Sequence, residues 1–169
     1  VSVPNGYLRN PQKYAVTIDE NGNLSIDGAT KKKDGSFVIY NDVPHSFRLI
    51  KKNATDGQTL SGAKFTLTGT SEYGTAVNLV KTTSTTGFAT FLNLEPGIYV
   101  LRETAAPAGY VLDSTARKVT ISHDGTVAID GLAQNNYGNF EVLNQEAEKQ
   151  KIVVTKKWIG KNPEFTENN

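Results

Sequence analysis

The stretch Gly97-Ile-Tyr-Val-Leu-Arg-Glu-Thr-Ala-Ala-Pro-Ala-Gly-Tyr110 joins an alternating strand pattern to a turn rich in Pro and Gly. Tyr99 and Leu101 fall on one face of this predicted strand, because successive side chains of a strand point to opposite faces. Other short segments carry similar β-branched and aromatic residues: Phe65-Thr-Leu-Thr68, Lys118-Val-Thr-Ile121 and Asn139-Phe-Glu-Val-Leu143. Turn signals separate them at Asp56-Gly57, Thr86-Gly87, Pro96-Gly97 and Asp124-Gly125. We therefore expect an all-β sandwich. Residues 146–151 are expected to form a polar linker between domains.

The sequence repeats itself at a fixed offset of 103 residues (119 − 16). Val16-Thr-Ile18 reappears as Val119-Thr-Ile121, and Ile26-Asp-Gly28 reappears as Ile129-Asp-Gly131. Further pairs at this offset are Pro4 and Pro107, Gly6 and Gly109, Tyr7 and Tyr110, Gly22 and Gly125, Gly35 and Gly138, Phe37 and Phe140, and Asn41 and Asn144. A period of this length is that of a whole domain and is too long for a solenoid.

The repeat divides the chain into one complete domain and parts of two others. We expect residues 1–43 to be the C-terminal half of a domain and residues 44–147 to be a complete domain. Residues 148–169 are expected to be a linker and the first strand of a further domain, because Ile152-Val-Val-Thr-Lys-Lys157 resembles Phe47-Arg-Leu-Ile-Lys-Lys52. The predicted architecture is a tandem of sandwich domains.

Composition argues against several classes of protein. The 18 Lys and Arg are scattered and nearly balanced by 17 Asp and Glu, so we expect no nucleic acid partner. No segment approaches the roughly 18 to 20 apolar residues of a membrane span, so we expect no membrane contact by this segment. Cysteine is absent, which removes disulfides and thiolate metal sites. His45 and His123 are the only histidines and lie near no nucleophile or metal motif, so we expect no conventional enzyme, metal or cofactor.

Three predicted strands end in a polar residue on their apolar face. Reading every second residue gives the rows Phe47, Leu49, Lys51; Tyr99, Leu101, Glu103; and Phe140, Val142, Asn144. Burying an unpaired charge is costly, so a buried lysine tends to lose its proton and a buried glutamate to gain one. A neutral Lys51 amine is a nucleophile, the Asn144 carboxamide is an electrophile, and a protonated Glu103 can polarise that carboxamide and move protons. We expect the three to meet and to form a Lys–Asn isopeptide bond with loss of ammonia.

The order of these residues resembles that in the Cna B-type, SpaA-like domains of Gram-positive pilins and surface adhesins. The pattern comprises Lys51, then Leu60-Ser-Gly-Ala-Lys-Phe65, then the stretch from Gly97 to Tyr110 quoted above, then Asn144. The resemblance implies an inverse immunoglobulin-like sandwich with its first and last strands side by side. It also implies that Lys51 and Asn144 form the isopeptide bond and that Glu103 catalyses it. Asn53 departs from the family, which more often has Asp there, and we expect this change to alter a turn.

The flanking segments carry parts of the same pattern. Val3-Pro-Asn-Gly-Tyr7 resembles the end of the family motif and Asn41 resembles its closing Asn, so the matching Lys and Glu are expected upstream of residue 1. Lys156 resembles the lysine of a further domain whose Glu and Asn are expected downstream. A further possibility is that residues 151–157 supply the missing first strand to residues 1–43, which would place Lys156 near Asn41, in cis or from another copy.

Each residue of the trio also has a plain structural interpretation. Lys51 could be a strand-end lysine with a solvated ammonium. Lys52 is the alternative register, although its face of the strand would carry Arg48. Glu103 could be an exposed carboxylate, and Asn144 could be a turn residue before the linker. The trio taken together within the family pattern favours the isopeptide interpretation.

The resemblance implies a structural stalk or pilin segment that is secreted and lies in the cell wall or on a pilus of a Gram-positive bacterium. Its expected partners are the neighbouring domains of the same chain, with other pilin subunits and host matrix as further candidates. The resemblance does not distinguish a pilus backbone, an ancillary pilin and a single-chain adhesin. The alternative is a domain that binds host matrix or glycan, with residues 69–86 and Tyr73 as the candidate surface. Asp19-Glu-Asn-Gly-Asn23 has the look of a calcium loop but lacks further acidic ligands, so we expect a hairpin turn there.

Overall fold

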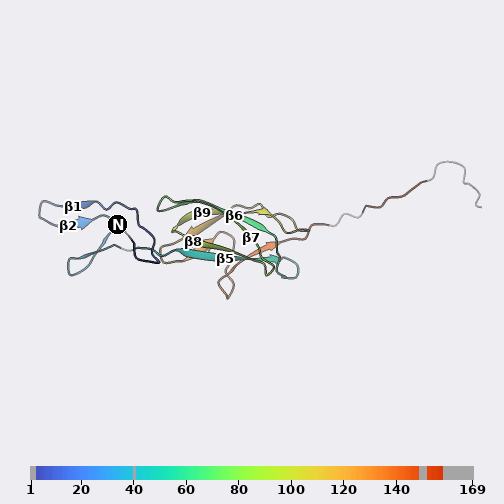
Figure 1. The fold of residues 1–169 in the computed structure, drawn as a ribbon, viewed down its shortest axis with the longest axis horizontal. Helices are drawn as coiled ribbons and strands as arrows, with labels where there is room; N and C mark the ends of the chain where they lie inside the picture. The colour runs from blue at the N-terminus through green and yellow to red at the C-terminus, as the bar shows by residue number, and fades with distance from the viewer. Residues whose placement is uncertain (1–2, 40, 149–151, 158–169) are drawn as a thin grey trace, which may run out of the picture.

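The computed structural model describes residues 3–39, 41–148 and 152–157, and the all-β prediction is confirmed there. These residues form strands joined by turns and loops, with no helix among them (Figure 1). The four N-terminal strands are β1 (Val16–Ile18), β2 (Leu24–Ile26), β3 (Thr30–Lys31) and β4 (Phe37–Val38). The others are β5 (His45–Asn53), β6 (Lys64–Ser71), β7 (Ala76–Thr82), β8 (Phe88–Leu94), β9 (Gly97–Ala105), β10 (Arg117–Ile121), β11 (Val127–Ile129) and β12 (Phe140–Asn144).

Strands β5 to β12 form a sandwich of two sheets. One sheet has the order β11-β10-β9-β6-β7 and the other the order β12-β5-β8. The strands pack through alternate residues. In β9 every second residue from Gly97 to Glu103 is buried, and the residues between them are exposed. The buried side chains of both sheets meet in one core of fifteen residues: Phe47, Leu49, Ala63, Phe65, Leu67, Ala89, Phe91, Leu94, Tyr99, Leu101, Val119, Ile121, Ile129, Phe140 and Val142. Phe47 stacks on Phe91 with ring centroids 4.9 Å apart, which fixes β5 against β8 at the centre of the smaller sheet.

The first and last strands of the sandwich lie side by side, as the family resemblance implied. β12 pairs with β5 in parallel, with Phe140 opposite Leu49 and Asn144 opposite Asn53. Parallel neighbours need a long crossover connection, and here the connection is the whole of the larger sheet together with β8. The chain therefore enters and leaves the sandwich along adjacent strands.

The N-terminal strands copy part of the sandwich at the offset of the sequence repeat. β1 pairs with β2 through Val16 opposite Ile26, and β10 pairs with β11 through Val119 opposite Ile129. The backbone bond from Asp27 N to Ala15 O recurs as Asp130 N to Lys118 O, both 2.9 Å long. Burial differs, however, because Val16 is 60% exposed whereas Val119 is fully buried. The β1–β2 pair thus repeats the backbone pairing of β10 and β11, but its apolar side chains are exposed.

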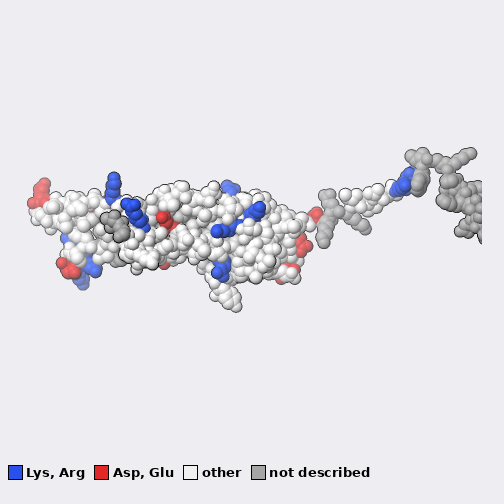
Figure 2. Space-filling model, in the orientation of Figure 1, with Lys and Arg blue, Asp and Glu red and all other residues white. Residues whose placement is uncertain are grey.

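Charged side chains are spread over the surface. On the face shown in Figure 2, the charged side chains are scattered over a mostly uncharged surface, and neither sign forms a continuous patch. Within the part of the chain that the structure describes, no helix is long and apolar enough to cross a membrane.

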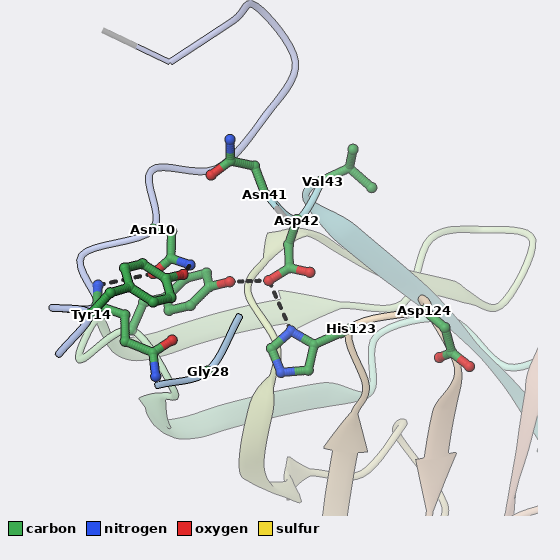
Figure 3. A pocket seen from close by; sticks show the side chains of 10 residues that line it. Asn10, Tyr14, Gly28, Asn41, Asp42, Val43, His123 and Asp124 are labelled. Carbon is green, nitrogen blue, oxygen red and sulfur yellow. Dashed lines mark hydrogen bonds and ion pairs between the residues drawn. The ribbon is translucent and has the colours of Figure 1, made fainter. Parts of the chain in front are cut away.

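Asp42 joins the N-terminal segment to the sandwich. Its buried carboxylate accepts a hydrogen bond from the Tyr73 hydroxyl in the β6–β7 turn and contacts His123 Nδ1 in the β10–β11 turn at 2.9 Å (Figure 3). Glu72 Oε2 lies 2.9 Å from the other ring nitrogen of His123, so two carboxylates flank the imidazole. The hydrogen bond that His123 donates to the Asp42 carboxylate raises the pKa of His123 above its usual 6.5. Burial and the neighbouring Asp42 raise the pKa of Tyr73, which keeps its hydroxyl a donor.

This junction should respond to pH through His123. Because the raised pKa reflects stabilisation of the protonated ring, the contribution of this contact to the stability of the fold is complete below the ordinary pKa. This contribution is lost as pH rises through the raised value. In an NMR titration we expect His123 to titrate above 6.5 and its pKa to fall in Asp42→Asn. Asp130→Asn, which alters an exposed acid away from the junction, should leave the pKa of His123 unchanged. An unaltered His123 pKa in Asp42→Asn would contradict this account of the junction.

Candidate functional site

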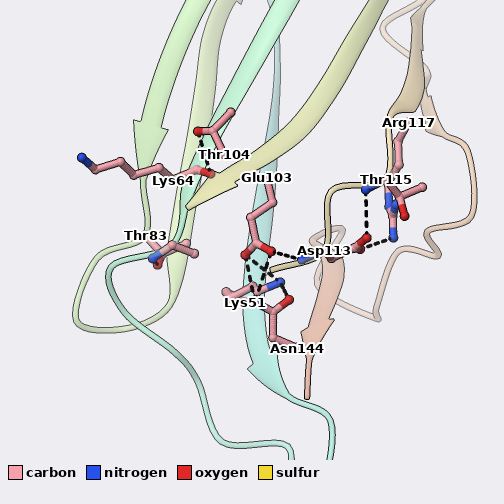
Figure 4. Close-up of polar contacts among 10 residues, drawn as sticks. Lys51, Lys64, Thr83, Glu103, Thr104, Asp113, Thr115, Arg117 and Asn144 are labelled. Carbon is pink, nitrogen blue, oxygen red and sulfur yellow. Dashed lines mark hydrogen bonds and ion pairs between the residues drawn. The ribbon is translucent and has the colours of Figure 1, made fainter. Parts of the chain in front are cut away.

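Lys51, Glu103 and Asn144 converge at one end of the sandwich core (Figure 4). Lys51 and Asn144 come from the neighbouring strands β5 and β12, and Glu103 comes from β9 in the facing sheet. Each follows an apolar row that points inward, so period-two alternation directs its side chain into the interior. Lys51 is fully buried, the Glu103 side chain is 1% exposed, and Asn144 is 2% exposed. Solvent therefore has almost no access to the three polar groups.

The three side chains contact one another pairwise. Lys51 Nζ lies 3.1 Å from Glu103 Oε1 and donates a hydrogen bond to Asn144 Oδ1. Asn144 Nδ2 donates to both carboxylate oxygens of Glu103, at 3.0 Å to Oε1 and 3.1 Å to Oε2. Glu103 Oε1 thus contacts both the lysine nitrogen and the amide nitrogen. A group that transfers a proton from one nitrogen to the other must lie in this position.

The backbone around Lys51 is fixed on both sides. Lys51 N donates to Gly87 O and Lys51 O accepts from Leu60 N, both at 2.8 Å. Gly87 has φ of +78°, and a Cβ at this position would lie 2.8 Å from Thr59 and 3.0 Å from Lys51 O. Only glycine suits this turn, because it combines positive φ with a close approach of backbone.

Burial controls the charge of the lysine. Desolvation lowers the pKa of Lys51, and the nearby Glu103 opposes this effect through its charge and its hydrogen bond. The face of the Phe65 ring lies 5.6 Å from Lys51 Nζ and closes one side of the site. The site therefore places an amine of lowered pKa against a carboxamide, with a carboxyl group in contact with both.

Residues 113–117 border the trio and were not identified from the sequence. The backbone N–H of Asp113 donates to Glu103 Oε2 at 2.9 Å, and Arg117 Nη2 lies 2.7 Å from Asp113 Oδ2. Burial tends to raise the pKa of Asp113, but hydrogen bonds from Thr115 and the charge of Arg117 outweigh it and hold the pKa below its usual value. A cavity of about 10 Å³ between this segment and Glu103 has room for about one water molecule. The 103-residue offset gives no signal for these residues, because Asp113, Thr115 and Arg117 align with Asn10, Gln12 and Tyr14 and no pair is identical.

Lys52 occupies the opposite face of β5 from Lys51. Lys52 Nζ lies 2.6 Å from Glu141 Oε1, in a pair whose side chains are 24% and 35% exposed. Asn53, the departure from the family pattern, is buried; its Oδ1 accepts from Thr55 N within a turn and its Nδ2 donates to Glu146 at 2.9 Å. An aspartate could not make the second of these contacts, because a carboxylate at neutral pH donates no hydrogen bond.

The two flanking candidates lie far from each other. Asn41 is exposed and lines a cavity of about 560 Å³ at the junction, together with Asn10, Gln12 and Tyr14. Lys156 belongs to the exposed segment 152–157, which has no strand and extends beyond the end of the sandwich opposite β1 and β2. The structure therefore does not bring Lys156 to Asn41 within this chain. Residues 149–151 and 158–169 of the expected further domain lie outside the described residues.

The remaining candidate segments are regular turns and strands. Residues 69–86, considered above as a binding surface, contain the end of β6, the turn with Tyr73, and β7. Asp19 Oδ1 accepts from Asn21 N and Asn23 N in the turn between β1 and β2. Among the described residues no group of His, Cys, Asp or Glu is arranged to hold a metal ion.

Comparison with known proteins places this chain in a family. The model of the SpaA family, a prealbumin-like fold domain, matches residues 45–137, more than half of the chain. A comparison with curated proteins returned no match.

Several solved structures are similar to parts of the chain. BcpA, the major pilin subunit of Bacillus cereus, is 33% identical over 62% of this chain and 29% of its own, with a TM-score of 0.43. The group B streptococcus pilus 2b backbone protein is 21% identical over 78% of this chain and 52% of its own, with a TM-score of 0.45. A C-terminal fragment of the pilus adhesin SpaC from Lactobacillus rhamnosus GG is 20% identical over 89% of this chain and 76% of its own, with a TM-score of 0.48. The chain thus spans less than a third of BcpA. From the match to residues 45–137, the chain belongs to the SpaA family of prealbumin-like fold domains.

Proposed function

We propose that this chain is a structural segment of a Gram-positive pilus or cell-surface stalk, and that its sandwich is closed by a self-formed amide bond between Lys51 Nζ and Asn144 Cγ. The observation that carries the proposal is the contact of a buried amine, a buried carboxamide and a buried carboxyl group in one site. A purely structural role explains such a cluster poorly, because burying charged groups costs more than a well-packed apolar core of the same volume.

The bond forms in a balanced sequence of steps. A proton passes from Lys51 Nζ to Glu103 Oε1 across 3.1 Å, which leaves a neutral amine beside the carboxamide. The amine attacks Asn144 Cγ, and Glu103 Oε1, 3.0 Å from Asn144 Nδ2, protonates this nitrogen as it leaves. The C–N bond of the asparagine amide breaks and a C–N bond to lysine forms. The lysine nitrogen then gives up its second proton, directly or through Glu103, to the departing ammonia, which leaves as ammonium. Glu103 ends ionised, as it began, and so acts as a catalyst.

Folding provides the rate. The same groups free in water would not react measurably, but fixed contact supplies an effective concentration of about 10⁵ to 10⁸ M. The two residues are 93 positions apart. By analogy with a disulfide, closing a loop of this length stabilises the fold by about 4 to 5 kcal/mol.

The position of the bond suits a protein under tension. Because β5 and β12 are adjacent and parallel, a pull on the two ends of the sandwich acts on these two strands first. The bond joins them directly, so force passes through a covalent link and the remaining strands carry little of it. Such a link also resists reductants, which break disulfides but not amides.

The repeat supports the wider domain proposal. Strands β1 and β2 pair in the register of β10 and β11, which supports the proposal that residues 1–43 are the C-terminal half of a preceding domain and residues 44–147 a complete one. The family and the pilin and adhesin names of the similar structures fit a secreted, cell-wall or pilus location, with neighbouring domains of the same chain as the first partners. The segment would serve equally in a pilus shaft or in the stalk of an adhesin.

Intact mass spectrometry tests the bond. We expect the folded chain to weigh about 17 Da less than its sequence mass, the mass of one ammonia. Glu103→Gln keeps the shape of the side chain but cannot relay the proton, so this variant should retain full mass. Glu141→Gln removes an acid that lies on β12 but outside the trio, so this variant should lose ammonia like the parent chain. A folded parent chain at full mass would end the proposal.

Thermal unfolding separates the two lysines. Lys51→Ala removes the bond and leaves Glu103 buried without its cation, so we expect the melting temperature to fall by at least about 10 °C. Lys52→Ala breaks only the partly exposed pair with Glu141, which contributes no more than about 1 kcal/mol. Equal losses in the two variants would contradict the special role of Lys51.

A further inference from the structure

The segment between β9 and β10 crosses the site beside Glu103 (Figure 4). Its contact with the trio is a backbone one, from Asp113 N–H to Glu103 Oε2 at 2.9 Å. The side chains of this segment hold its backbone in place. Asp113 Oδ2 pairs with Arg117 Nη2 at 2.7 Å, and Asp113 Oδ1 accepts from Thr115 N at 3.1 Å. Residues 113–117 therefore form a closed loop, here called the strap.

The strap recurs 103 residues earlier with different chemistry. Asn10 Nδ2 donates to the Tyr14 hydroxyl at 2.6 Å, and Gln12 N donates to Asn10 Oδ1 at 2.9 Å. These residues align with Asp113, Thr115 and Arg117, so an uncharged pair spans the same two positions as the ion pair. Asn10 and Tyr14 line the same cavity as Asn41, the residue aligned with Asn144. A link between the first and fifth side chains of this segment thus occurs in both repeats, as an ion pair in one and as a neutral hydrogen bond in the other.

The strap makes the two oxygens of Glu103 different. Oε2 receives the Asp113 N–H, and a backbone amide can only donate, so this oxygen must act as an acceptor. Both oxygens lie near Asn144 Nδ2, at 3.0 Å for Oε1 and 3.1 Å for Oε2, but the contact with Lys51 Nζ, at 3.1 Å, is made by Oε1. A proton taken from the lysine therefore passes to Oε1, the oxygen without the backbone donor, which is also within reach of the leaving nitrogen.

We propose that Asp113 and Arg117 are positioning residues for isopeptide formation: their link holds the strap on Glu103 and selects Oε1 as the oxygen that carries the proton. This inference rests on the function proposed above. It adds a requirement outside the reacting trio, namely that residues 113 and 117 be joined by their side chains, through charge or through a neutral hydrogen bond.

The test follows the rate of ammonia loss. The 169-residue chain, isolated unfolded and at full mass from inclusion bodies, is refolded by dilution and sampled by intact mass spectrometry. We expect Arg117→Leu, which leaves no hydrogen-bond donor at this position, to slow the loss by about 10- to 100-fold, because small misplacements of a reacting group have effects of this size. The double variant Asp113→Asn with Arg117→Tyr, which copies the Asn10–Tyr14 pair, should restore the rate to within about threefold of the parent chain.

A matched control is Glu141→Gln, which breaks the pair with Lys52. That pair is partly exposed like the Asp113–Arg117 pair, whose side chains are 26% and 18% exposed, but it does not touch Glu103. We expect this variant to react at the parent rate, and circular dichroism should show that all variants refold.

The outcomes distinguish the two proposals. A refolded parent chain that keeps full mass overturns the isopeptide proposal and the strap with it. Ammonia loss in the parent chain with equal rates in Arg117→Leu and Glu141→Gln overturns the strap alone. A double variant as slow as Arg117→Leu also overturns it, because the restored link would then have no effect on the reaction.

Discussion

The burial of one lysine amine constrains the rest of the sandwich. A lysine without solvent contact needs an acceptor for its protons and a neighbour that tolerates either charge state. Glu103 from the facing sheet and Asn144 from the adjacent strand meet these needs together. Because the partners come from both sheets, the site can exist only when the two sheets are packed and in register. The geometry of the trio thus reports the completion of the fold.

The parallel pairing of β5 with β12 is the second constraint. It places Lys51 and Asn144, which are 93 residues apart, on one sheet and on one side of it. The glycine at position 87 and the turn through Leu60 fix the backbone of β5 where the lysine lies. The Asn53–Glu146 contact and the bond from Ala54 N to Asn144 O fasten the end of β12 to the end of β5 just beyond the site. Local contacts of this kind limit how far the two strands can slide, which keeps the amine against the carboxamide.

Much of this arrangement could be predicted because it follows from short-range rules. Period-two alternation directs Lys51, Glu103 and Asn144 inward without knowledge of the sheets, and the 103-residue repeat shows which segments are equivalent. The strap could not be predicted in this way, because its contact with Glu103 comes from a backbone N–H in an irregular segment, where no side-chain pattern indicates direction. The Asp42–His123 contact was missed for a related reason: it joins residues 81 positions apart, one in the irregular segment before β5 and one in the β10–β11 turn, and such segments carry no periodic signal.

The position of Asn144 in the last strand has a consequence for biogenesis. A chain that emerges from a ribosome or an export channel with its N-terminus first presents the lysine and the glutamate long before the asparagine. In the proposed reaction the electrophile joins them only when β12 docks, so a domain still in transit would stay a linear polymer that can be threaded. The proposed covalent closure would then be deferred to the place where the whole domain is free to fold, and each domain of the proposed tandem array would be sealed in turn behind the one that preceded it.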